Sequence, residues 1–177
     1  SIFQLHPNLL RLGLCCKFTH EPIKFHVTTA TAMLRLPRSA QLARIADLCR
    51  ANSEALLASL EFCASNGIGA FRINSQILPL KTHPTVGYTM DELPGNAEII
   101  ANFRECGRFA RLHNLRVSFH PDQFVVINSP NPQTLAHSLA ELNYQAEVAE
   151  WVDADTINIP GGGAYGDKAA ALSVLCK

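Results

Sequence analysis

The amino-acid sequence predicts an α/β fold of the TIM-barrel type, in which parallel strands alternate with helices. Two observations support this class. Short apolar segments that suit buried strands alternate with longer segments whose apolar residues recur every three or four positions, as on one helix face. Polar residues and glycines follow the strand segments, whereas plain turns such as Asn66-Gly67 precede them. Barrels and open parallel sheets carry their chemistry at the carboxyl ends of the strands.

Four strand-then-helix units follow one another along the chain. The predicted strands cover residues 10–16, 68–74, 115–120 and 155–159. The predicted helices run from residue 40 to the Asn66-Gly67 stop, from about 97 to 113, from Pro132 to about 151, and over 168–176. Asn131 before Pro132 is a typical helix start, because Asn caps the first amides and Pro suits the first helical position. Residues 17–38, with Pro22 and Pro37, are expected to be an irregular connection.

The length suggests only part of a barrel. Eight units need roughly 250 residues, and four units fill these 177 residues. We therefore expect one partial barrel domain, residues 1–177, equivalent to about the first half of the ring; a complete open sheet is the alternative. A half-barrel would leave a strand edge and an apolar sheet face uncovered. Such a chain is expected to need further units or self-association.

Charge and cysteine spacing exclude several function classes. The 15 basic and 15 acidic residues balance, so nucleic-acid binding would need a local basic stripe. Its candidate members are Lys24, Lys81, Arg104, Arg108, Arg111 and Lys168. None of the six cysteines forms C-x-x-C, and no segment resembles a signal peptide or a membrane span. These features indicate a cytoplasmic protein with reduced cysteines; Cys49, Cys63 and Cys106 are expected to pack as small apolar residues.

Two histidines follow adjacent predicted strands. His83 lies in the loop LPLKTHP, and His120 ends the third strand in SFHPDQF. Imidazoles that meet at a barrel mouth are common metal ligands, although a single loop histidine is more often structural. Gln123 can donate and accept hydrogen bonds at a base edge, and Phe124 offers a stacking face. The alternative for Phe124 is a place in the core, since it begins the apolar run FVVI.

The fourth strand ends in Pro160 and three glycines. Gly161, Gly162 and Gly163 would let the backbone approach a phosphate near the next helix, whose predicted start is Lys168. The spacing fits neither the dinucleotide-binding nor the NTP-binding glycine motif. The reason for a proline at this strand end is not evident from the pattern.

Six blocks of the sequence carry a family resemblance. They read, in chain order, LRLGLCC, EPIKF, FRINSQILPLKTHP, LRVSFHPDQFVVINSP, YQAEVAEW and INIPGGGAYGDK. In this order they resemble the UV damage endonuclease family, which is similar to endonuclease IV and the xylose-isomerase-like barrels. The resemblance implies a DNA repair endonuclease that uses a divalent metal, usually manganese, and nicks double-stranded DNA immediately 5′ to UV photoproducts.

The resemblance also implies roles for individual residues. His83 and His120 match metal ligands, Gln123 matches a lesion probe, and Phe124 replaces a neighbouring Tyr of some members. Tyr165 and Lys168 lie in the segment that matches the glycine loop, with no firm role beyond approach to a phosphate. Pro160 stands where the family has a ligand histidine, so it marks a lost ligand position. No residue is assigned as catalytic.

These departures predict weak or absent activity for the 177-residue chain. Further ligands of the family lie on strands beyond the four found here, and phosphodiester hydrolysis with bound metal ions needs many carboxylate and imidazole ligands. Two other functions stay open. One is a metal-dependent sugar isomerase or epimerase of the same fold, and the other is a non-catalytic remnant that binds DNA or a protein partner.

Overall fold

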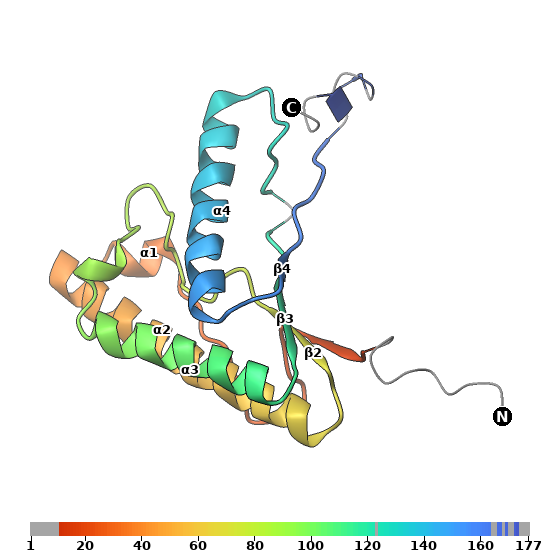
Figure 1. Cartoon of the computed structure of the whole chain (residues 1–177). Helices are drawn as coiled ribbons and strands as arrows, with labels where there is room; N and C mark the ends of the chain where they lie inside the picture. Colours follow the sequence, from red (N-terminus) through yellow and green to blue (C-terminus); the bar gives the residue numbers. More distant parts are fainter. Residues whose placement is uncertain (1–10, 123, 164–165, 168, 170–171, 174–177) are drawn as a thin grey trace.

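The described part of the chain forms one parallel sheet with helices on one side (Figure 1). In the computed structural model, the described residues are 11–122, 124–163, 166–167, 169 and 172–173. The strands are β1 (Gly13–Cys15), β2 (Ala70–Ile73), β3 (Arg116–Phe119) and β4 (Thr156–Ile157). They lie in the order β1-β2-β3-β4, and each neighbouring pair is parallel. A parallel sheet in sequence order is what four consecutive strand-then-helix units predict.

The three long predicted helices are confirmed as α2 (Arg38–Ser65), α3 (Asn96–Leu112) and α4 (Pro132–Trp151). The α4 start follows the predicted cap, because the Asn131 side chain accepts hydrogen bonds from the Gln133 and Thr134 amides. Two short elements were not predicted: α1 (Ala30–Met33) and the 3₁₀ turn η1 (Met90–Glu92). Both are too short for apolar periodicity to reveal them.

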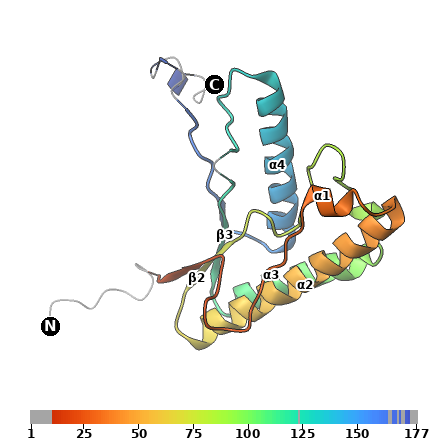
Figure 2. The same cartoon turned by 180° about the vertical axis from the view of Figure 1, so that it is seen from behind.

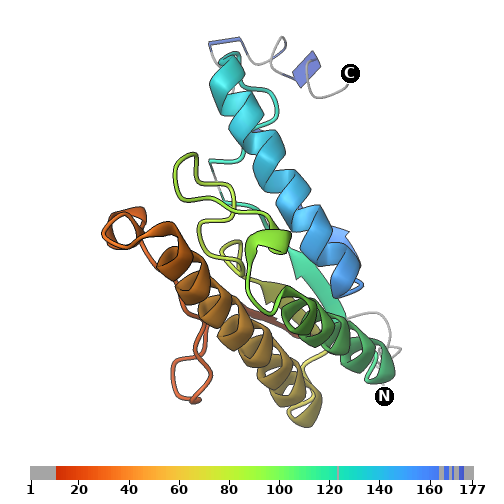
Figure 3. The ribbon, with the colours of Figure 1, turned by 90° about the vertical axis from the view of Figure 1, so that its left-hand side faces the viewer.

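The core lies between the sheet and the helices. Figure 3 shows α2, α3 and α4 in one layer in front of the strands. Phe71 and Ile73 of β2 and Val117 and Phe119 of β3 are buried on this side. Cys49, Cys63 and Cys106 pack among them as small apolar residues, as expected. The alternation of buried and accessible positions along β2 and β3 therefore assigns one strand face to the core.

The opposite face of the sheet is polar, so the expectation of an uncovered apolar face is wrong for the described residues. In register across β2, β3 and β4 this face carries Arg72, Ser118 and Thr156, and Arg116 donates a hydrogen bond to Thr156. In Figure 2 the helices again lie to one side of the strands, and the segment between β1 and α1 passes alongside α2. The alternation of a strand sends these side chains away from the helices.

The strands are shorter than predicted at both ends, because the turns before them and the loops after them take their first and last residues. Residues 74 and 120, for example, lie beyond β2 and β3 and begin the site loops. The predicted helix over 168–176 falls mostly outside the described residues. No helix in the described part is long and apolar enough to cross a membrane. The cytoplasmic location stays a prediction.

Candidate functional site

The carboxyl ends of the strands open onto two cavities with a common wall. One cavity, of about 300 Å³, is lined by His83, Phe124 and residues of α4. The other, of about 680 Å³, is lined by His120 and by residues that follow β1. Ser75, Gln76 and Asp122 line both. The two predicted ligand histidines therefore lie at the same rim of the sheet, on either side of this wall.

Two buried polar side chains fix the loop after β2. The Tyr144 hydroxyl on α4 donates to the Ser75 carbonyl at 2.6 Å and accepts from the Leu78 amide at 3.3 Å. Burial raises the pKa of the Tyr144 phenol far above its usual value, so it remains a donor. Asn52 on α2 donates to the carbonyls of His26 and Ile77 and accepts from the His26 amide. The rim is thus held by the helices behind it.

Neither residue was predicted as part of the site. The only sequence signal for Asn52 is a polar residue inside the apolar stripe of a helix, where it interrupts the pattern. Such a residue is buried at a cost unless its hydrogen bonds are made, and Asn52 makes three of them with no exposed surface. Tyr144 gives no signal, because a Tyr in a helical stripe is an ordinary core residue.

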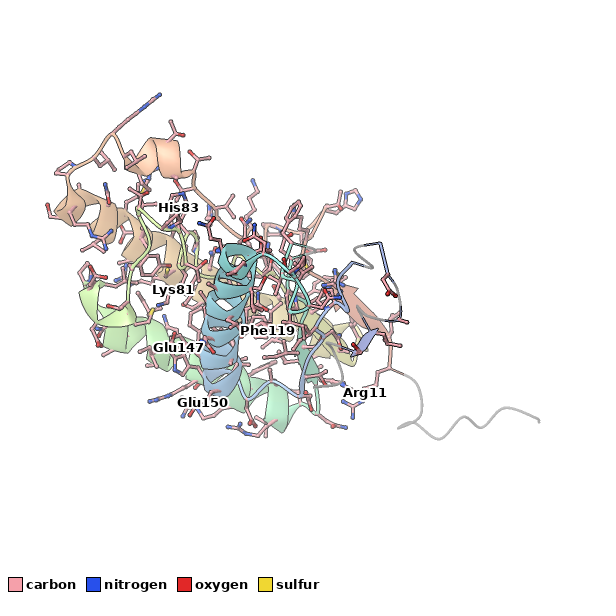
Figure 4. The ribbon with its side chains drawn as sticks, turned by 90° about the horizontal axis from the view of Figure 1, so that it is seen from above. Arg11, Lys81, His83, Phe119, Glu147 and Glu150 are labelled. Carbon is pink, nitrogen blue, oxygen red and sulfur yellow. The ribbon has the colours of Figure 1, made fainter. Side chains whose placement is uncertain are left out.

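The His83 loop is tied to α4. Lys81 approaches Glu147 to 3.9 Å and donates to the Tyr88 carbonyl, and Thr82 hydrogen-bonds to Glu141. Figure 4 shows Lys81 and His83 on the loop beside α4, which carries Glu147. His83 Nδ1 accepts the Thr85 and Val86 amides at 3.2 and 3.3 Å. In the neutral ring the proton therefore sits on Nε2. If a metal binds at Nε2, the proton must move to Nδ1, and Nδ1 can then no longer accept the two amides.

His120 has the opposite tautomer. Its Nδ1 lies 2.8 Å from the Pro121 carbonyl, which can only accept, so Nδ1 donates. Nε2 then keeps a free lone pair, which is the arrangement found in metal-binding histidines whose other nitrogen donates to a carbonyl. His120 is exposed at the rim and lines the larger cavity. It is the better prepared ligand of the pair.

Asp122 fixes the backbone at Phe124 and Val125 through two hydrogen bonds. Asp122 accepts the Phe124 amide at its carboxylate, at 3.1 Å, and the Val125 amide at its carbonyl. The Phe124 ring is 71% exposed, so the alternative of a core position is excluded. Gln123 lies outside the described residues. An exposed ring at a cavity mouth is free to stack against a flat ligand.

The glycine loop is held by Asn128. The Asn128 side chain is buried and donates through Nδ2 to the Gly163 carbonyl at 3.0 Å. Gly162 has φ +80°, and a Cβ at this position would lie 1.8 Å from Asn128 Oδ1. Only glycine fits both the backbone angle and the contact. Gly161 and Gly163 are exposed and Pro160 is partly exposed, whereas Tyr165 and Lys168 lie outside the described residues.

Most of the proposed basic stripe does not line the rim. Arg108 and Arg111 form ion pairs with Glu105 and Asp153, and Arg104 lies with them in a separate hollow between α3 and α4. Lys81 is used inside the fold, as described above. Lys168 is outside the described residues. Lys24 does line the larger cavity, and Lys17, which was not among the predicted members, lines it as well. Sequence order alone does not show on which side of the layer a helical arginine lies.

The described residues do not complete a metal site. Within them, no three His, Cys, Asp or Glu side chains lie close enough together to hold an ion. Proline offers no donor atom at position 160. His120 can serve as a metal ligand through Nε2 as it stands. His83 can do so only after its ring gives up the hydrogen bonds with the Thr85 and Val86 amides. Two imidazoles are fewer than the three protein ligands of a typical catalytic zinc site.

Parallel strands in sequence order, an outer helical layer and reactive side chains at the carboxyl rim place the chain in the class of (β/α) barrels. The solved structure of SacUVDE matches it with a TM-score of 0.80 over 93% of this chain and 54% of that one, at 23% identity. This likeness supports the fold class, and it extends over about half of that chain.

Residues 10–177 match the family described as UV-endonuclease UvdE, and the chain belongs to this family. The UV DNA damage endonuclease of Bacillus cereus (strain ATCC 10987 / NRS 248) is 32% identical over 147 residues, 81% of this chain and 45% of the relative. The protein of the same name from Bacillus velezensis (strain DSM 23117 / BGSC 10A6 / LMG 26770 / FZB42) is 32% identical over 160 residues, 89% and 48% respectively. The chain spans about half the length of these curated relatives.

Proposed function

We propose that this chain is part of a UV damage endonuclease, a DNA repair enzyme that incises the phosphodiester 5′ to UV photoproducts in double-stranded DNA. The observation that carries the proposal is the family match over residues 10–177, which includes every predicted site residue. The family match does not favour a sugar isomerase of the same fold or a non-catalytic remnant. The substrate is proposed from the resemblance and from the names of the relatives.

The rim supplies groups suited to damaged DNA. Phe124 presents an exposed ring at the edge of the smaller cavity, and stacking on such a ring contributes about 1–3 kcal/mol per base. Lys17 and Lys24 line the larger cavity and can contact phosphates. Gln123, the neighbour of Phe124, is proposed as the second lesion contact. Residues 161–163 are proposed to approach the DNA backbone through their exposed main chain.

A divalent metal, with Mn²⁺ as the expected ion, is proposed as the cofactor. Such ions supply an activated water and neutralise charge on the phosphate during phosphodiester hydrolysis. His120 and, after rotation, His83 would contribute two ligands, and the remaining ligands must come from outside the described residues. We therefore expect weak or no incision by the 177-residue chain alone.

Lesion recognition can be tested separately from incision. The measurement is the anisotropy of a labelled duplex with one photoproduct, titrated with the chain, beside a nicking assay in Mn²⁺. We expect a preference for the damaged duplex that Phe124→Ala weakens by about tenfold, since one lost stack costs about 1.4 kcal/mol. Leu139→Ala is the matched control, because Leu139 is an exposed apolar residue of α4. Equal binding of damaged and undamaged duplexes would contradict the proposed function.

The proposed ligand position at Pro160 has its own test. Isothermal titration with MnCl₂ should show weak binding to the native chain, a further loss in His120→Ala and tighter binding in Pro160→His. The expected gain is about tenfold, as one added imidazole restores a metal–ligand bond. His113→Ala is the control, because His113 follows the last residue of α3 and lines neither of the two cavities. If Pro160→His leaves the affinity unchanged, position 160 is not a ligand position.

We also propose that the chain associates with itself or with another polypeptide through the free side of β4. Within the described sheet, β4 pairs only with β3, so its other side offers unpaired backbone groups.

Free cysteines in the described part are compatible with the proposed cytoplasmic location.

A further inference from the structure

Two neighbouring cysteines at the end of β1 hold their sulfurs unusually close together. Cys15 Sγ and Cys16 Sγ are 3.1 Å apart. Successive side chains of an extended strand point to opposite faces, so adjacent cysteines normally keep their thiols apart. Cys15 is exposed and Cys16 is half-buried at the wall of the larger cavity. The chain must therefore turn sharply at this point.

A strained turn produces the contact. Cys16 has φ +61°, a left-handed value that is uncommon for residues other than glycine. The Lys17 amide donates to the Cys15 carbonyl at 2.7 Å, which closes a three-residue turn around Cys16. The Cys16 amide donates to the Arg72 carbonyl at 3.2 Å and anchors the turn to β2. Strain held at a cavity wall is a reason to look for a function there.

The surroundings distinguish this pair from the other cysteines of the described part. Arg72 is in register with Cys15. Burial, followed by the hydrogen bond with Cys15, raises the pKa of Cys16, and Arg72 offsets part of this rise. The remaining described cysteines are enclosed in the core. Burial raises the pKa of their thiols, to about 11 for Cys49 and Cys63 and about 12 for Cys106. Among the described cysteines, only Cys15 and Cys16 combine access with a neighbouring thiol.

We propose that Cys15 and Cys16 form an oxidisable pair that closes to a reversible disulfide under hydrogen peroxide. The exposed Cys15 thiolate attacks one peroxide oxygen, the O–O bond breaks, and hydroxide leaves to give Cys15 sulfenic acid. The Cys16 sulfur then attacks the Cys15 sulfur, the S–O bond breaks, and water leaves with the Cys16 proton. Overall the two thiols lose two electrons and two protons, and one peroxide becomes two waters. This step does not depend on the proposed DNA repair function.

The product is expected to be easily reduced. Neighbouring Cα atoms are 3.8 Å apart, whereas disulfides usually join Cα atoms separated by 4.4–6.8 Å. A disulfide between adjacent residues is therefore strained, and strained, exposed disulfides are the labile and regulatory ones. Since Cys16 lines the cavity that also contains His120, closing the ring changes one wall of the candidate site. The pair is a modification site that responds to peroxide.

Peptide mass analysis can test the pair directly. Cleavage after Arg11 and Lys17 releases Leu12–Lys17, which contains Cys15, Cys16 and no other cysteine. After the folded full chain is treated with one equivalent of hydrogen peroxide and then alkylated, we expect this peptide to lose two hydrogens and carry no alkyl groups. Treatment with dithiothreitol before alkylation should restore two alkylated thiols. The peptides with Cys49, Cys63 and Cys106 should be unchanged.

Three variants separate disulfide closure from other oxidation. In Cys16→Ser, the Leu12–Lys17 peptide should gain oxygen at Cys15 instead of losing hydrogen. In Cys15→Ser, oxidation of this peptide should fall at least tenfold, because the exposed thiol is gone. Cys63→Ser should leave the disulfide yield unchanged. The proposal is overturned if the native peptide gains oxygen atoms or remains reduced while thiols elsewhere are oxidised. A circular dichroism spectrum of each variant verifies that it is folded.

Discussion

At the scale of single residues, Asn128 and Gly162 determine the shape of the loop that follows β4. The buried Asn128 amide donates to Gly163, and its oxygen lies directly against Gly162, where the backbone is left-handed. Asn128 Oδ1 has no hydrogen-bond partner among the described residues, so the Cα–H of glycine is its nearest complement. The loop thus depends on a contact between two strand ends. Pro160 offers no side-chain ligand atom at the end of β4, but the contact of Asn128 with Gly162 does not involve it.

Replacing Gly162 by Ala should disturb the loop more than the same change at Gly166. Both glycines have positive φ, which costs a non-glycine residue about 1–2 kcal/mol, but only at Gly162 would the new Cβ strike a buried side chain. Nothing lies within 4 Å of a Cβ at Gly166. We expect amide hydrogen exchange over residues 158–163 to rise by at least tenfold in Gly162→Ala and to change little in Gly166→Ala. Equal effects in both variants would show that backbone strain alone matters.

At the scale of elements, α2 does more than cover the sheet. Its Asn52 joins the segment after β1 to the loop after β2, and these are two of the loops that line the larger cavity. The hydrogen bonds are made with the main chain, so Asn52 supports the position of the loops without specifying their side chains. The rigidity of the rim is therefore set by a helix residue that touches no ligand.

Asn52→Ala is expected to destabilise the chain by about 3 kcal/mol. The change leaves the buried Ile77 carbonyl and the part-buried amide and carbonyl of His26 without these partners, and a buried group left unsatisfied costs about 1–3 kcal/mol. Asn102→Ala is the matched control, since the Asn102 side chain on α3 donates a hydrogen bond of 3.2 Å to the Ser53 hydroxyl on α2. Urea unfolding followed by circular dichroism measures both. A loss below 1 kcal/mol for Asn52→Ala would mean that the two loops find other support.

The elements also show what the sequence could and could not predict. The period of α2, α3 and α4 and the Asn131 cap are local features, so their helices and the order of the strands were predictable. The side chains that fix the site are different, because Tyr144 meets Ser75 only after distant segments fold together. The exposure of Phe124 was also undecidable, since an apolar run continues directly from it. The tautomer of His120 was not predictable either, because it is set by the contact of Nδ1 with the Pro121 carbonyl in the folded structure.

At the scale of the whole molecule, the described sheet has the strand order and layering of a barrel segment, and the face away from the helices is polar. That face carries Arg72, Arg116, Ser118 and Thr156, and so gives little hydrophobic drive for association. The remaining drive lies at the strand edge. The Asn158 amide donates inward to Phe119. Because amides alternate along an extended backbone, we expect the amide of Ile159, two residues beyond β4, to point away from the sheet. Ile159 is also an exposed apolar residue.

Sedimentation velocity should therefore show concentration-dependent association that a single change at Ile159, two residues beyond β4, weakens. Ile159→Pro removes the outward amide and part of the exposed apolar surface, yet keeps the inward bond of Asn158. We expect its dissociation constant to rise by about tenfold, the equivalent of about 1.4 kcal/mol for one lost hydrogen bond and its contacts. Leu139→Ser removes a comparably exposed apolar residue from α4 and should leave association unchanged. If the native chain sediments as a monomer at every concentration and unfolds cooperatively, the edge needs no partner. If Leu139→Ser weakens association as much as Ile159→Pro, the contact lies on the helical layer instead.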